Sequence, residues 1–153
     1  MVGGLIALVV VLAAASAAGF ALRQRQGRFR PAARGASAAT QPAAPADVLS
    51  AVDLGSPLGA RATLVQFSTE VCAYCGPTRK LLTEVARERD GVSFVEIDAA
   101  QRMDLTRRLH VLSTPTVLVL DALGGITSRA SGPLRKADLL LAVGAVADTG
   151  GAS

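Results

Sequence analysis

The chain contains two cysteines, Cys72 and Cys75, which are separated by two residues. Two thiols at this spacing can form a disulfide with each other and can exchange it with another molecule. They could also supply two of the ligands of a metal ion. No other part of the sequence offers comparable chemistry, so this cysteine pair is the candidate catalytic site.

The sequence on either side of the cysteine pair predicts a strand before it and a helix after it. Residues Ala62 to Ser68 form a short apolar, β-branched run that is typical of a buried strand, and an amphipathic pattern then continues to about Arg89. The first turn of a helix has unpaired N–H groups and the positive end of the helix dipole. Because this environment favours a thiolate, we expect the pKa of Cys72 to lie below its ordinary value of about 8.5.

Pro77 lies inside the expected helix, shortly after the cysteine pair. A proline has no N–H to donate to the carbonyl four residues earlier, which here belongs to Ala73. We therefore expect the helix to be kinked or loosened just beyond the cysteines.

The residues around the cysteine pair resemble the thioredoxin family. The run Phe67-Ser68-Thr69-Glu70-Val71-Cys72 matches the approach to that family's active site, and Ser113-Thr114-Pro115-Thr116 is similar to its cis-proline segment. The likeness covers about residues 48–146. It implies an α/β thioredoxin fold, with a central mixed β-sheet and helices on both faces. It also implies a redox-active disulfide that needs no other cofactor.

The resemblance implies roles for individual residues. Cys72 would be the exposed nucleophile, and Cys75 the more buried cysteine that resolves the mixed disulfide. A cis Thr114–Pro115 bond would present the backbone of Thr114 beside Cys72, where it could pair with an extended substrate segment. Tyr74 is either an ordinary surface aromatic or, as we expect, a contact for the substrate in the same groove.

The spacing also decides between two registers of the motif. Tyr74-Cys75-Gly76-Pro77 superficially matches the family's active site with its last cysteine lost. Phe67, however, lies five residues before Cys72, as the family pattern requires, and eight before Cys75. The motif is therefore Cys72-Ala73-Tyr74-Cys75.

Two departures from the family concern the chemistry of the pair. Gln66 stands where thioredoxins usually have a buried aspartate that helps move a proton to or from the second cysteine, and a neutral amide cannot do this. Ala73-Tyr74 replaces the usual dipeptide between the cysteines. Reduction potential depends strongly on that dipeptide, so the direction of electron flow stays open at this point.

The rest of the domain is predicted to alternate strands and helices in the thioredoxin order. The strands are expected at 92–98, 116–120 and 126–130, and the helices at 102–110 and 136–147. Gly124-Gly125 predicts a hairpin between the last two strands. The segment between Asp47 and Gly59 is expected to form a first element whose type the sequence leaves open.

The N-terminal region differs from this domain in composition. Leu5 to Leu22 is an uncharged apolar run of 18 residues, long enough at about 1.5 Å per residue to cross nearly all of a hydrocarbon core of about 30 Å. We predict one transmembrane helix at 1–22. A cleaved signal peptide is the alternative, but no Lys or Arg precedes the run.

The predicted anchor is followed by three further regions. An Arg-, Ala- and Pro-rich linker without regular structure is expected at 23–46. The thioredoxin-like domain is expected at 47–149. A short tail at 150–153 is expected to fray.

The distribution of charge predicts which side of the membrane the domain occupies. The net charge is +4, but five arginines lie between residues 23 and 34, while residues 35–153 carry 11 basic and 12 acidic side chains. By the positive-inside rule the domain faces the cytoplasm. The extracytoplasmic face is the alternative, because membrane-anchored relatives in bacteria often work there. The near-neutral domain shows no basic patch with exposed aromatics, which argues against nucleic-acid binding.

Two classes of function follow. The first is a membrane-tethered thiol–disulfide oxidoreductase that reduces disulfides of protein partners, with an electron donor that the sequence does not identify. The second is a non-enzymatic thioredoxin-like module that binds a partner or transfers a metal ion. Zinc would need about four ligands, and the chain offers two thiols and the distant His110, so we expect no metal site. Covalent haem attachment would need a histidine at position 76, where this chain has Gly76, so we expect no covalent haem.

Overall fold

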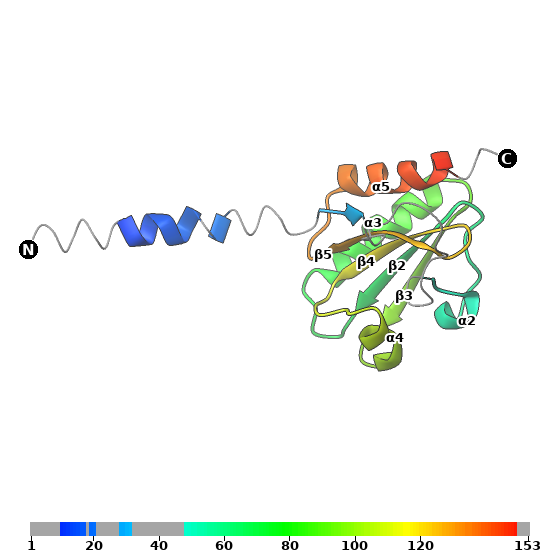
Figure 1. Ribbon diagram of the computed structural model, residues 1–153, viewed down its shortest axis with the longest axis horizontal. Coiled ribbons are helices and arrows are strands. Elements are labelled where there is room, and N and C mark those ends of the chain that lie inside the picture. Colours follow the sequence, from blue (N-terminus) through cyan, green and yellow to red (C-terminus); the bar gives the residue numbers. More distant parts are fainter. Residues whose placement is uncertain (1–9, 18, 21–27, 32–47, 150–153) are drawn as a thin grey trace, which may run out of the picture.

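The computed structural model describes residues 10–17, 19–20, 28–31 and 48–149. The domain is a mixed β-sheet with helices on both faces (Figure 1). Its elements are β1 (Arg30–Pro31), α2 (Ala51–Leu54), β2 (Ala62–Ser68), α3 (Cys75–Glu88), β3 (Val92–Asp98), α4 (Met103–Arg108), β4 (Thr116–Asp121), β5 (Ile126–Ser131) and α5 (Lys136–Thr149).

The strand order in the sheet is β1-β5-β4-β2-β3. β2 and β3 are parallel, and α3 forms the crossover between them, whereas β2 with β4 and β4 with β5 are antiparallel pairs. β2 therefore has a neighbouring strand on each side, and all seven of its residues are buried. Its last residue is followed, four positions later, by the first cysteine of the pair.

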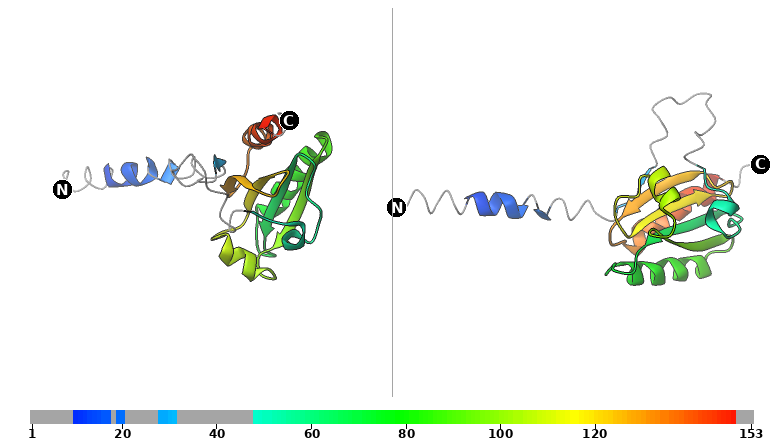
Figure 2. Two further views of the ribbon diagram at one scale, coloured as in Figure 1. Left: turned by 45° about the vertical axis from the view of Figure 1, so that its right-hand side comes forward. Right: turned by 90° about the horizontal axis from the view of Figure 1, so that it is seen from below.

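The sheet separates two apolar cores, because alternate residues of a strand face opposite sides. Val65 and Phe67 of β2 belong to the core on the side of α2 and α4. Ala62 and Leu64 belong to the core on the side of α3 and α5. Figures 1 and 2 show these two pairs of helices on opposite faces of the sheet. The predicted thioredoxin architecture is thus confirmed for the domain.

The first element of the domain, whose type the sequence left open, is the short helix α2. Ser50 and Asp53 form a capping box, since the Ser50 hydroxyl accepts from the Asp53 N–H and the Asp53 carboxylate accepts from the Ser50 N–H. Gly55 ends the helix at φ +65°, a conformation that glycine adopts without steric cost.

The sequence predicted a kink in the helix at Pro77, but the structure places this proline in the first turn of the helix. α3 begins at Cys75, so Pro77 occupies its first turn, where N–H groups have no intrahelical acceptor in any case. The next residue, Thr78, already donates to the Tyr74 carbonyl at 3.1 Å. The bond that Pro77 cannot make, to the Ala73 carbonyl, would lie ahead of the helix, so its loss does not interrupt α3.

The linker predicted at 23–46 was expected to lack regular structure, and this is wrong at two residues. Arg30 and Pro31 form β1, which pairs antiparallel with Arg129 and Ser128 of β5. Phe29, directly before β1, is half-buried against the core that α3 and α5 cover. Proline is tolerated in an edge strand, where its missing N–H need not join the ladder. The rest of the predicted linker lies outside the described residues.

The predicted anchor at 1–22 lies partly outside the described residues. Within the described part, residues 10–17 are helical and exposed. Among the residues that were placed, no helix is both long and apolar enough to cross a membrane. The predicted tail at 150–153 also lies outside the described residues.

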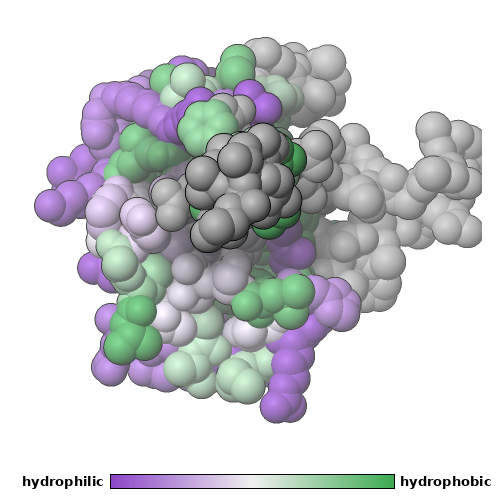
Figure 3. Space-filling view, turned by 90° about the vertical axis from the view of Figure 1, so that its left-hand side faces the viewer, coloured by the Kyte–Doolittle hydropathy of each residue, from purple (hydrophilic) through white to green (hydrophobic). Residues whose placement is uncertain are grey.

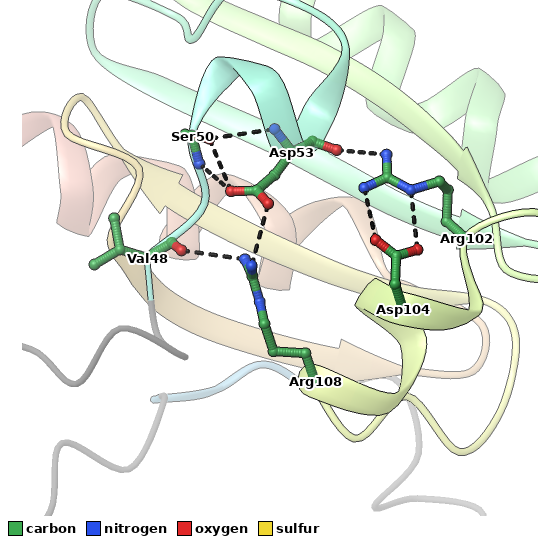
Figure 4. A network of polar contacts seen from close by, with 6 residues as sticks. All are labelled: Val48, Ser50, Asp53, Arg102, Asp104 and Arg108. Atoms are coloured by element: carbon green, nitrogen blue, oxygen red, sulfur yellow. Dashed lines mark hydrogen bonds and ion pairs between the residues drawn. The ribbon is translucent and has the colours of Figure 1, made fainter.

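A polar network joins α2 to α4 on one face of the sheet (Figure 4). Arg102, just before α4, donates to the Asp53 carbonyl at 2.7 Å and is paired with Asp104. Arg108, at the end of α4, lies 3.1 Å from the Asp53 carboxylate and also donates to the Val48 carbonyl. The network therefore connects segments that are about fifty residues apart in the chain.

Asp53 makes the stability of the domain sensitive to acid. The Ser50 N–H, followed by the Ser50 hydroxyl and Arg108, holds the pKa of Asp53 below its ordinary value. A lowered pKa in the folded state gives a stabilisation that is complete above the unfolded pKa of about 3.9 and is lost as the pH falls through the folded pKa. We therefore expect acidification from pH 6 to pH 3 to lower the unfolding free energy less in Asp53→Asn than in the unsubstituted protein.

Urea denaturation at a series of pH values measures this effect. Asp90→Asn makes the same change of charge at an exposed residue and serves as the matched control. It should keep the pH dependence of the unsubstituted protein. Equal pH dependence in Asp53→Asn would show that the network does not supply the acid-sensitive stability.

Candidate functional site

The cysteine pair lies between the end of β2 and the start of α3, as the sequence predicted. Cys72 and Cys75 are joined by a disulfide. Cys75 is the first residue of α3 and only 3% exposed, whereas Cys72 lies in the preceding turn and is partly exposed. A partner that approaches from solvent can therefore reach the sulfur of Cys72 more easily than that of Cys75.

The start of α3 has no side-chain cap. Its N-cap residue, Tyr74, makes no capping hydrogen bond, and the Cys75 N–H donates to the Cys72 carbonyl at 3.2 Å. The positive end of the helix dipole favours negative charge near a helix start. A thiolate that forms on Cys72 thus lies just ahead of a helix end that favours it.

Thr114 and Pro115 precede β4, and the bond between them is cis, as the resemblance implies. Pro115 is buried, and its carbonyl accepts from the Gly132 N–H at 2.8 Å. The Thr116 hydroxyl donates to the Ser113 carbonyl at 2.7 Å. The first bond joins the turn before β4 to the residue after β5, and the second lies within the turn.

Arg129 holds the segment that leads from α4 to this turn. Its guanidinium, on β5, donates to the carbonyl of Leu109, the residue that caps the end of α4. Burial lowers the pKa of Arg129, but an arginine remains charged throughout the usual pH range. His110, which follows Leu109, is exposed and has φ +49°, so it terminates α4 as a left-handed residue.

Thr69 links the proline turn to the cysteine segment. Its hydroxyl lies 3.1 Å from the Thr114 hydroxyl. Thr69 stands three residues before Cys72, so the contact sets the residue that precedes Pro115 beside the approach to the first cysteine. Sequence reasoning missed this contact, because a pair of threonines 45 residues apart leaves no local pattern.

Gln66 lies beneath the second cysteine. It is 0% exposed, and its Nε2 donates to the Cys75 carbonyl at 3.0 Å. Its Oε1 is buried without a hydrogen-bond partner. The sequence marked Gln66 as a departure from the family, and the structure adds that the residue contacts Cys75 directly.

Exposed hydrophobic side chains flank the cysteine pair and the proline turn. Val71 is 97% exposed, Tyr74 is 57% exposed and Leu112 is 94% exposed. Figure 3 shows the side of the molecule that is on the left in Figure 1, and hydrophobic and hydrophilic residues are mixed over its described surface. Tyr74 is therefore exposed to solvent, and its contact with a substrate stays a prediction.

Within the described residues, no group of three or more His, Cys, Asp or Glu side chains is placed to hold a metal ion.

The chain is similar to known proteins of one family. The model of the thioredoxin family matches residues 56–144. Chloroplastic thioredoxin z is similar in structure, with 28% identity and a TM-score of 0.51 over 57% of this chain and 79% of that one. No curated protein matches the chain.

Two further solved structures share the fold at lower identity. Thioredoxin-2, a component of the protein secretion machinery of the malaria parasite, is 16% identical, with a TM-score of 0.51 over 56% of this chain and 82% of that one. A malarial protein without a more specific description is also 16% identical, with a TM-score of 0.51 over 56% of this chain and 97% of that one.

Proposed function

The chain belongs to the thioredoxin family, and from this premise we propose that it is a membrane-tethered thiol–disulfide oxidoreductase that reduces disulfides of protein partners. One observation carries the proposal. The two cysteines form a disulfide in which Cys72 is partly exposed and Cys75 is buried at the start of α3. This difference in exposure suits a reaction in which Cys72 attacks the partner's disulfide and Cys75 then releases the partner.

The reduced protein reacts in two exchange steps. The Cys72 thiolate attacks one sulfur of the partner's disulfide, which forms a mixed disulfide and releases the partner's other sulfur as a thiolate. Cys75 then loses its proton and attacks Cys72, which releases the partner's second thiol and leaves the Cys72–Cys75 disulfide. The partner gains two electrons and the cysteine pair loses two. An electron donor that the sequence does not identify must return them.

The proline turn and its exposed neighbours position the partner. The backbone of Thr114 is expected to pair with an extended segment of the partner, as an added strand pairs with a sheet edge. The Thr69–Thr114 contact supports this role because it fixes that backbone relative to the cysteine segment. Val71, Tyr74 and Leu112 supply exposed apolar surface for the residues around the partner's disulfide.

Insulin reduction tests the enzymatic function. The whole chain, in detergent, should accelerate the reduction of insulin disulfides by dithiothreitol above the uncatalysed rate. A non-enzymatic module that binds a partner or transfers a metal ion is the alternative function for the same site. It would give no acceleration, and that result would reject the oxidoreductase.

We further propose that the domain faces the cytoplasm at the membrane surface. The support is the cluster of five arginines after the apolar run, with no Lys or Arg before it. Anionic lipids of the cytoplasmic leaflet would attract these arginines. In that compartment the cysteine pair would be kept mainly reduced, which fits the proposed direction of electron flow.

Labelling on intact cells tests the orientation. Ala137 is an exposed residue of α5, so Ala137→Cys in a Cys72→Ser, Cys75→Ser background gives one accessible thiol. A membrane-impermeant maleimide should label it only after the cells are permeabilised. Efficient labelling of intact cells would place the domain on the extracytoplasmic face instead.

A further inference from the structure

Gln66 is fully buried in β2 and has one satisfied and one unsatisfied polar atom. Strand alternation places its side chain on the same face as Ala62 and Leu64, under α3 and α5. Its Nε2 donates to the Cys75 carbonyl at 3.0 Å, while its buried Oε1 has no partner. A buried acceptor without a donor costs free energy, so a hydrogen-bond donor within reach of Oε1 would stabilise the protein.

The orientation of the amide follows from its chemistry. If the side-chain amide were turned by half a rotation, Oε1 would face the Cys75 carbonyl oxygen, and two acceptors would meet. Nε2 must therefore take the carbonyl. Oε1 and Nε2 share one carbon, so Oε1 belongs to the same amide group that contacts the backbone of Cys75, the residue that changes when the disulfide is reduced.

Cys75 has no side-chain donor in the disulfide and has one in the dithiol. When a dithiol donor reduces the pair, two electrons and two protons enter, the bond between the two sulfurs breaks, and the donor becomes a disulfide. Each cysteine then carries an S–H group, which is a weak hydrogen-bond donor. Cys75 is 3% exposed, and burial in apolar surroundings favours its protonated form.

We propose that Gln66 is a positioning residue whose Oε1 accepts the S–H group of reduced Cys75, so that it stabilises the dithiol relative to the disulfide. The proposal rests on the redox function proposed above and adds a residue that tunes it. Its consequence is a higher reduction potential for the cysteine pair than an apolar residue at the same place would give.

Redox equilibrium with dithiothreitol measures this effect without any turnover. The whole chain, in detergent, is equilibrated with mixtures of reduced and oxidised dithiothreitol, and its dithiol fraction is counted by alkylation and mass spectrometry. Gln66→Met keeps a side chain of similar size and removes both Oε1 and Nε2. We expect its equilibrium constant for reduction to fall about tenfold, which is about 30 mV for a two-electron couple.

Thr63→Val is the matched control. Thr63 is a buried polar residue of the same strand whose hydroxyl accepts from the Gly59 N–H, far along the strand from the cysteines. It should leave the equilibrium constant unchanged. A shift in Thr63→Val as large as in Gln66→Met, or no shift in Gln66→Met, would overturn the role of Gln66. An unsubstituted protein that does not exchange with dithiothreitol at all would instead overturn the proposed function.

A second measurement does not depend on the folding of Gln66→Met. The side-chain carbonyl carbon of Gln66 should change its NMR shift when the unsubstituted protein is reduced, whereas that of exposed Gln101 should not. In reduced Cys75→Ala, which has no S–H group at this place, the Gln66 signal should lack the change. The same Gln66 shift in reduced Cys75→Ala and in the reduced unsubstituted protein would exclude the hydrogen bond.

Discussion

Replacing Cys72 with serine should reduce the rate of insulin reduction to that of the uncatalysed reaction. Cys72 is the more exposed of the two sulfurs, and a serine hydroxyl neither ionises readily at neutral pH nor forms a disulfide. Cys75→Ser should give a different result. Cys72 can still attack a partner there, but nothing releases the partner, so the mixed disulfide should accumulate.

Non-reducing gels and mass spectrometry after a thiol quench distinguish the two variants. Cys75→Ser should show a covalent adduct with the partner that disappears on reduction, and Cys72→Ser should show none. Ala137→Ser, at an exposed residue of α5, introduces the same hydroxyl away from the site and should keep the normal rate. Adducts that form in Cys72→Ser and not in Cys75→Ser would reverse the two roles.

Phe67→Ala should destabilise the domain by about 3 to 5 kcal/mol, because it removes a large side chain and leaves a cavity that the core cannot fully close. Phe67 is 0% exposed and lies in the core that α2 and α4 cover. Small domains are stable by only about 5 to 15 kcal/mol, so this change removes a large share of the total. Urea denaturation of the oxidised protein measures the difference.

Val71→Ala is the comparison for this effect. Val71 is also hydrophobic and lies four residues further on, but it is 97% exposed. Its replacement should change the unfolding free energy by no more than about 0.5 kcal/mol. If the two substitutions cost the same, Phe67 does not anchor the core as the structure indicates.

Local sequence pattern was enough to find most of the fold. Strands β2 and β3 have the bounds that their apolar, β-branched runs predicted, and the double glycine at 124–125 lies at the hairpin between β4 and β5. These features are local, since each depends on residues a few positions apart. The resemblance to the thioredoxin family rested on such short runs and is confirmed.

Local pattern failed where a contact from another part of the chain decided the outcome. Arg30 and Pro31 have a composition typical of a linker, yet β5 offers an open edge and the neighbouring core accepts Phe29. The effect of Pro77 on the helix depended instead on where α3 begins, which is Cys75. The start of a helix is set by the turn before it, so a periodic pattern predicts the first residue of a helix less well than its interior.

The sequence by itself identified the two thiols as the candidate chemistry, because cysteines three positions apart can form a disulfide where the chain turns between them, as it does here. Tertiary structure alone decided which groups surround those sulfurs. The Thr69–Thr114 contact joins segments 45 residues apart, and the bond from Gln66 to Cys75 depends on α3 lying over β2. The physical reason is that burial and hydrogen bonding are properties of the packed chain, so the spacing of residues in the sequence does not predict them.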